Sequence, residues 1–187
     1  MIALPCLPAL HVGDEQDCHA LGPVTKVALP LRLAPGVGVE ETCRDLGSQT
    51  FAGVLHACKY PCHANATGLP PLGDSRYLAY RVSDADLTLN MIDPPVPLFS
   101  VELFRVALDF LDERLALGPV LIHCNQGLSR APSLALVYLA KRTGPHRDYG
   151  EPYSYEEAWR GFAAVYPAYA PGAGLVTFLT EHWREIA

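Results

Sequence analysis

An eight-residue segment combines a cysteine, a glycine and an arginine at a spacing that suits phosphate chemistry. Residues 123–130 read His-Cys-Asn-Gln-Gly-Leu-Ser-Arg, so Arg130 follows Cys124 by six positions. The segment lies between an expected buried strand and an expected helix, and the first amides of a helix have no internal acceptor. A loop that wraps back on such a helix start turns its amides inward and forms a cradle for an anion. Gly127 allows the positive φ or the close approach that this wrap requires.

Cys124 and Arg130 are the two residues in the segment that would act on a bound phosphate. A helix N-terminus and nearby cations favour the thiolate form of a cysteine. The planar guanidinium of Arg130 can bind two phosphate oxygens at once. The expected chemistry is attack by Cys124, a phosphocysteine intermediate and then hydrolysis. Neither a metal nor another cofactor is required, because the arginine and the helix terminus supply the positive charge. Amides expected to bind the phosphate come from Asn125, Gln126, Gly127, Leu128 and Ser129.

The elements around this segment predict an α/β fold. Pro119–Ile122 is wholly apolar, as expected for a central parallel strand, and residues 131–142 form a predicted helix. Upstream, Ser100 can cap an amphipathic helix that runs to about residue 116. Leu87–Ile92 alternates apolar and polar residues, which is typical of a strand. Strand, helix, strand and helix in succession indicate a crossover connection and a parallel sheet.

The rest of the chain contains weaker signals and no repeat or long linker. We therefore expect a single domain over residues 1–187, with a central, mostly parallel sheet flanked by helices and with helices at its C-terminal end. The further expected elements are strands at Ala9–Gly13, Thr25–Leu33, Phe51–Ala57 and Tyr77–Val82, a helix at Val39–Leu46, a loop over 60–75, a helix opened by a capping box of Ser154 and Glu157, and a last helix at Pro171–Ile186.

Composition narrows the range of partners. The chain of 187 residues has a formal net charge of −6, which disfavours non-specific binding to nucleic acid. Its apolar runs are far shorter than the roughly 20 residues that span a bilayer, so no membrane association is expected. The first ten residues lack the basic start of a secretory signal. We expect a cytoplasmic protein whose six cysteines are reduced. The oligomeric state cannot be predicted from these features.

The segment around Cys124 resembles the dual-specificity branch of the cysteine-dependent protein tyrosine phosphatases. The signature of that superfamily is His-Cys, five residues and Arg, which His123, Cys124 and Arg130 match, with Gly127 and Ser129 in register. The resemblance covers residues 87–142 and extends more loosely over the whole chain. It implies a phosphatase fold, no metal, and phosphotyrosine or phosphoserine/threonine proteins as substrates.

The resemblance also implies an aspartate on a separate loop that protonates the leaving oxygen. Asp93 is the favoured candidate, because it follows a strand and lies in a loop that two prolines stiffen. It also precedes the helix that leads to the strand before Cys124. Asp84 and Asp86 are the alternatives, since they follow another expected strand.

One position departs from the family pattern. Many members have Ser or Thr after the signature arginine, and its hydroxyl stabilises the departing thiolate, but this chain has Ala131. We expect slower breakdown of the phosphocysteine unless Ser129 or Ser133 substitutes. Two alternative functions remain open. One is a phosphate-recognising module without turnover. The other is an enzyme acting on RNA 5′ ends, inositol lipids or arsenate.

Two further cysteines precede the expected acid. Cys58 or Cys62 could form a redox pair with Cys124, as in some superfamily members, although a plain buried thiol is the favoured interpretation. Cys58, Cys62 and His63 also suggest zinc, but they lack a clear second pair of ligands. His123 is expected to brace the loop by hydrogen bonding rather than to act as a base.

Overall fold

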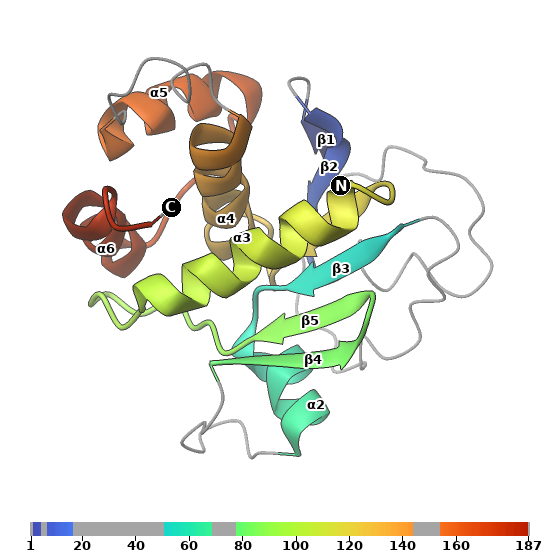
Figure 1. Cartoon of the computed structure of the whole chain (residues 1–187). Helices are drawn as coiled ribbons and strands as arrows, with labels where there is room; N and C mark the ends of the chain where they lie inside the picture. Colours follow the sequence, from blue (N-terminus) through green and yellow to red (C-terminus); the bar gives the residue numbers. More distant parts are fainter. Residues whose placement is uncertain (1, 5–6, 17–50, 69–77, 144–153, 187) are drawn as a thin grey trace.

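The computed structural model describes residues 2–4, 7–16, 51–68, 78–143 and 154–186. Its described part contains a six-stranded sheet in the order β1-β2-β6-β3-β5-β4 (Figure 1). The pairs β2–β6, β6–β3 and β3–β5 are parallel, whereas both outer pairs are antiparallel. The predicted α/β class with a mostly parallel sheet is confirmed. The strands are β1 (Ile2–Leu4), β2 (Leu7–Gly13), β3 (Gly53–His56), β4 (Ala79–Ser83), β5 (Asp86–Leu89) and β6 (Val120–His123).

The helices follow the predicted order over the second half of the chain. Those that match predicted helices begin and end within a few residues of the expected bounds. The helical segments are η2 (Lys59–His63), α2 (Ala64–Thr67), α3 (Val101–Leu115), α4 (Arg130–Tyr138), η3 (Leu139–Thr143), α5 (Tyr155–Val165) and α6 (Ala173–His182).

Strand β6 occupies the centre of the sheet. All four of its residues are buried, which explains why the sequence there is almost wholly apolar. Its last residue, His123, is level with Gly13 of β2 and His56 of β3. The chain after β6 therefore leaves the sheet at the edge where three parallel strands end together, which is the usual place for a binding site in such folds.

Helices α3 and α4 cover one face of the sheet and contact each other (Figure 1). Ser100 caps α3 as predicted, because its Oγ accepts a hydrogen bond from the amide of Leu103 at 3.2 Å. The apolar side of α3 is buried, while Arg105 and Asp109 on its other side are exposed. The amphipathic pattern of this segment thus directs α3 onto the sheet.

Helices α5 and α6 form a further layer outside α4. The predicted capping box is present, since Ser154 Oγ accepts from the amide of Glu157 and the Glu157 carboxylate accepts from the amide of Ser154. On α6, Phe178 stacks on Phe104 of α3 with ring centroids 5.3 Å apart. This contact fixes the C-terminal segment against the core that supports the sheet.

The expected loop over residues 60–75 is wrong for part of its length, because residues 61–67 are helical, whereas Tyr60 is extended. Pro61 and Gly68 suggested a break in structure. In the structure, Pro61 lies near the start of the helical segment, where proline is tolerated, and Gly68 ends it at φ +67°. The expected strand Thr25–Leu33 and helix Val39–Leu46 lie outside the described residues.

Two expectations from composition concern the described residues. No helix among them is both long and apolar enough to cross a bilayer. Cys58, Cys62 and Cys124 are buried, and no disulfide links any two of them.

The buried face of α3 gives a prediction about stability. Leu108 is fully buried, so Leu108→Ala leaves a cavity and should lower the free energy of unfolding by about 2–5 kcal/mol. Leu117→Ala is the matched control, because that side chain is 68% exposed and should cost little. Urea unfolding followed by circular dichroism measures both. Equal losses in the two variants would contradict the assignment of this core.

Candidate active site

Cys124 is the first residue after β6 and lies under a loop that ends at helix α4. Its side chain is buried, with 1% of the residue exposed. Gly127 adopts φ +69° in the middle of the loop, as the sequence predicts, and α4 begins at Arg130. The structure therefore places the cysteine, the turn and the helix start in the predicted strand-loop-helix arrangement.

The carbonyl groups of the loop are held from outside by the segment between α5 and α6. The hydroxyl of Tyr166 donates to the carbonyl oxygen of Gly127 at 2.9 Å, and the amide of Ala170 donates to that of Leu128 at 2.9 Å. In a planar trans peptide the N–H points opposite to the C=O. The amides of Leu128 and Ser129 therefore point away from the C-terminal segment, as an anion cradle requires.

Arg130 is oriented by two hydrogen bonds. Its Nη1 donates to the carbonyl oxygen of Met91 at 3.0 Å, and its Nη2 donates to Oδ1 of Asn125 at 2.7 Å. The buried Nε has no hydrogen-bond partner within the described ranges of the chain. Among the described residues, no carboxylate lies within ion-pair distance of this guanidinium. Its charge is therefore not neutralised by a described carboxylate, and these bonds use only two of its five N–H donors.

Asn125 links the loop to two elements that the sequence did not connect with it. Its Nδ2 donates to Oε2 of Glu15 at 3.0 Å and to the carbonyl oxygen of Tyr60 at 2.9 Å. Glu15 is buried beside the site. Sequence reasoning missed it, although it is the second residue after β2, which is parallel to β6. Residues at the ends of such strands meet at one edge of the sheet.

Of the three candidate acids, Asp93 lies beside the loop. Its carboxylate fills the space that a Cβ on Gly172 would occupy, and the amide of Gly172 donates to Ser129 Oγ at 3.0 Å. Asp86 instead accepts a hydrogen bond from His56 Nε2 at 2.7 Å. Asp84 lies in the turn between β4 and β5, at the amino end of β5 and away from the loop.

The two hydroxyls proposed to replace a serine at position 131, those of Ser129 and Ser133, both contact the C-terminal segment. Ser129 Oγ accepts from the amide of Gly172, and Ser133 Oγ is 2.9 Å from the hydroxyl of Tyr169. Burial raises the pKa of Tyr169, and nearby Tyr155 and Asp93 add to this effect, so its hydroxyl stays protonated. Ala131 itself is fully buried.

The cysteines before the site have different neighbours from those that the sequence suggested. Cys62 Sγ lies 3.9 Å from Nε2 of His123, whereas His63 Nδ1 is hydrogen-bonded to Thr88 Oγ1 at 3.1 Å. The suggested group of Cys58, Cys62 and His63 is therefore not the one that the fold assembles. His123 is buried, and its side chain is hydrogen-bonded to His56 rather than to the loop that it was expected to brace. A redox pair with Cys124 stays a prediction.

The positive φ of Gly127 gives a prediction about anion binding. Gly127→Ala should strain the loop by about 1–2 kcal/mol, because an L-residue with a Cβ disfavours this region. If this strain changes the conformation of the loop, the affinity of the protein for tungstate should fall by about tenfold, as measured by calorimetry. Gly161→Ala is the control, since a Cβ there meets open space. Undiminished tungstate binding by Gly127→Ala would show that this loop does not form the anion site.

Comparison with known proteins identifies the fold. No protein-family model matches the sequence. Human DUSP28 matches with a TM-score of 0.57 and 14% identity, over 98% of this chain and 93% of that one. DUSP15 matches with a TM-score of 0.56 and 18% identity, over 95% and 84%. A leucine-rich-repeat and phosphatase-domain protein from Entamoeba histolytica matches with a TM-score of 0.53 and 13% identity, over 98% of this chain and 94% of that one. This chain therefore has the fold of the dual-specificity phosphatases.

Proposed function

We propose that this protein hydrolyses phosphomonoesters through a phosphocysteine intermediate. The proposal depends on the environment of the Arg130 guanidinium. Hydrogen bonds to Met91 and Asn125 orient it, but no described carboxylate neutralises its charge. A fixed cation beside inward-pointing amides stabilises the charge on a transferring phosphoryl group. Cys124, buried at the base of the same loop, is the nucleophile.

The two chemical steps assign one role to each residue. The Cys124 thiolate attacks phosphorus and the bond from phosphorus to the leaving oxygen breaks, while Asp93 donates a proton to that oxygen. A water molecule then attacks the phosphocysteine, Asp93 accepts its proton, and the thiolate departs with phosphate released. The position of Asp93 against Gly172, next to Ser129, supports this choice of acid over Asp84 and Asp86.

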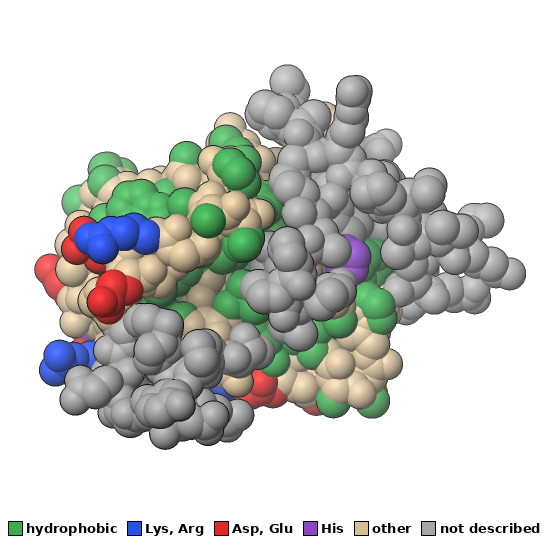
Figure 2. All heavy atoms as spheres, turned by 90° about the horizontal axis from the view of Figure 1, so that it is seen from above, with side chains coloured by type: hydrophobic (Ala, Val, Ile, Leu, Met, Phe, Trp, Pro, Cys, Tyr) green, Lys and Arg blue, Asp and Glu red, His purple; other side chains and the backbone are tan. Residues whose placement is uncertain are grey.

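The proposed substrates are proteins phosphorylated on tyrosine or on serine and threonine. Exposed apolar side chains flank the site, with Tyr60 beside Asn125 and Ile92 beside Asp93, which suits a peptide or aryl group. On the face shown in Figure 2, basic side chains lie beside acidic ones. Arg81 and Arg142 both pair with carboxylates. This distribution gives little support to an inositol lipid or RNA substrate, which favours a basic surface.

A slower variant of this function has support from residue 131. Ala131 provides no hydroxyl, and Ser133 is hydrogen-bonded to Tyr169. Slow hydrolysis of the phosphocysteine would make the protein a phosphate-recognising module with little turnover. Rapid quenching of the reaction distinguishes the two, because the module accumulates the intermediate and the efficient enzyme does not.

Replacement of the nucleophile tests the proposal directly. Cys124→Ser should reduce hydrolysis of p-nitrophenyl phosphate to the rate without enzyme, because the serine hydroxyl is a far weaker nucleophile. Cys58→Ser, another buried cysteine, is the control and should keep activity under reducing conditions. Release of phosphate is measured in both. Equal rates for Cys124→Ser and the parent would rule out the phosphocysteine route.

Leaving-group dependence tests the acid. Asp93→Asn should lower the rate on phenyl phosphate, whose leaving group needs a proton, by about 10²- to 10⁴-fold, and should affect activated aryl phosphates much less. Asp84→Asn should leave both rates near those of the parent protein. A larger loss in Asp84→Asn than in Asp93→Asn would mean that the acid is misassigned.

A further inference from the structure

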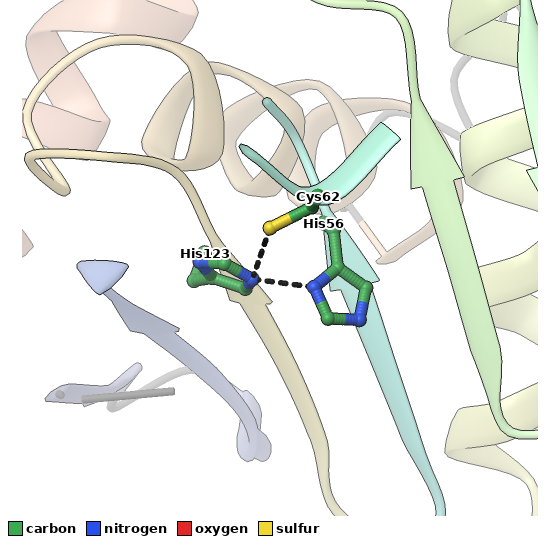
Figure 3. A group of neighbouring side chains, drawn as sticks. All are labelled: His56, Cys62 and His123. Atoms are coloured by element: carbon green, nitrogen blue, oxygen red, sulfur yellow. Dashed lines mark hydrogen bonds between the residues drawn. The ribbon is translucent and has the colours of Figure 1, made fainter. Parts of the chain in front are cut away.

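Three donor side chains from separate elements converge at the end of β6, where the chain enters the loop that contains Cys124 (Figure 3). His123 ends β6, His56 ends β3 and Cys62 lies in η2. Their ligand atoms lie within 4.8 Å of one another, and all three residues are buried. We propose that these residues bind a divalent transition-metal ion, with Zn²⁺ as the best fit.

The chemistry of the donors favours Zn²⁺. Two imidazole nitrogens and one thiolate are typical zinc ligands, whereas Mg²⁺ and Ca²⁺ require oxygen ligands. Three protein ligands leave the fourth position of a tetrahedral ion for a water molecule. Cys124 and Arg130 take no part, so the site stands independently of the proposed hydrolysis.

The observed distances are close to those of a zinc site. Zn–N and Zn–S bonds of about 2.05 and 2.3 Å at tetrahedral angles place two nitrogens about 3.3 Å apart, and a nitrogen and a sulfur about 3.6 Å apart. In the structure, His123 Nε2 lies 2.7 Å from His56 Nδ1 and 3.9 Å from Cys62 Sγ. Side-chain shifts of less than about 1 Å would therefore accommodate the ion.

Asp86 places a proton so that His56 can bind the metal. His56 Nε2 lies 2.7 Å from Asp86 Oδ1, and an ionised carboxylate only accepts hydrogen bonds. The proton of His56 is therefore on Nε2, which leaves the lone pair of Nδ1 facing the cluster. A carboxylate behind a metal-binding histidine is a recurrent arrangement that orients the ring and raises its basicity.

The protons and charges balance when the ion binds. Cys62 releases its thiol proton, and the proton of His123 moves from Nε2 to Nδ1, an atom with no hydrogen-bond partner in the part of the chain that the structure describes. The two positive charges of Zn²⁺ are offset by the Cys62 thiolate and the Asp86 carboxylate. The buried group is then neutral overall, which avoids the large cost of an uncompensated buried charge.

Cobalt provides a direct readout of this site. The full chain carrying Cys124→Ser removes the proposed nucleophile as a competing thiol, and Co²⁺ is added after treatment with a chelator. One equivalent of Co²⁺ should bind with a thiolate-to-cobalt absorption band, which one equivalent of Zn²⁺ abolishes and excess Mg²⁺ does not. Absence of stoichiometric binding would overturn the proposal.

Variants in the same Cys124→Ser background assign the ligands. Cys62→Ser should lose the absorption band, whereas Cys58→Ser, which changes a neighbouring buried cysteine outside the cluster, should keep it. Asp86→Asn leaves all three donors in place and should weaken Zn²⁺ affinity by about 10- to 100-fold. A band that survives Cys62→Ser would overturn the proposal.

Folding is checked separately from metal binding. Circular dichroism and urea unfolding in the presence of the chelator should give the same fold for each variant and its parent. If Cys62→Ser fails to fold, Asp86→Asn decides the outcome. Unchanged Zn²⁺ affinity in a folded Asp86→Asn protein would overturn the proposal, and the expected loss would support it.

Discussion

The orientation of two peptide planes is the constraint on which the candidate site depends. The carbonyl oxygens of Gly127 and Leu128 are engaged by Tyr166 and Ala170, and this fixes where the following amides point. A short loop has no internal bonds that would do this, because its amides must remain available to a ligand. Helices α5 and α6 are therefore part of the site, even though they are distant from Cys124 in sequence. Their packing on α4 and on Phe104 carries the orientation of the loop back to the core.

Charge at the site is arranged around Arg130. The guanidinium contacts Met91 and, through Asn125, the buried carboxylate of Glu15. Glu15 is thus linked to the arginine through a neutral amide rather than by an ion pair. This separation keeps the arginine oriented while its charge remains effective toward an anion, since a direct carboxylate partner would compete for the same donors.

Local signals made much of this structure predictable. The apolar run before Cys124, the cap at Ser100 and the capping box at Ser154 each depend on neighbouring residues, and each gave an element close to the observed bounds. The cluster of His56, Cys62 and His123 was not predicted, because His123 is 61 residues from Cys62 and 67 from His56. Such contacts follow from strand order and register, which composition and periodicity do not specify. Pro61 and Gly68 misled for the opposite reason, since both residues suit helix ends as well as loops.

Two glycines connect the proposed acid with the segment that supports the loop. The Asp93 carboxylate packs against Gly172, and the backbone carbonyls of Pro94 and Val96 approach Gly174 so closely that a Cβ would collide with them. The loop that carries Asp93 and the start of α6 are therefore in close contact: a side chain at Gly174 would collide with backbone atoms, and one at Gly172 would displace the Asp93 carboxylate. A larger residue at both positions would require the loop that carries Asp93 to move outward, so small residues at these two positions keep this loop next to Ser129.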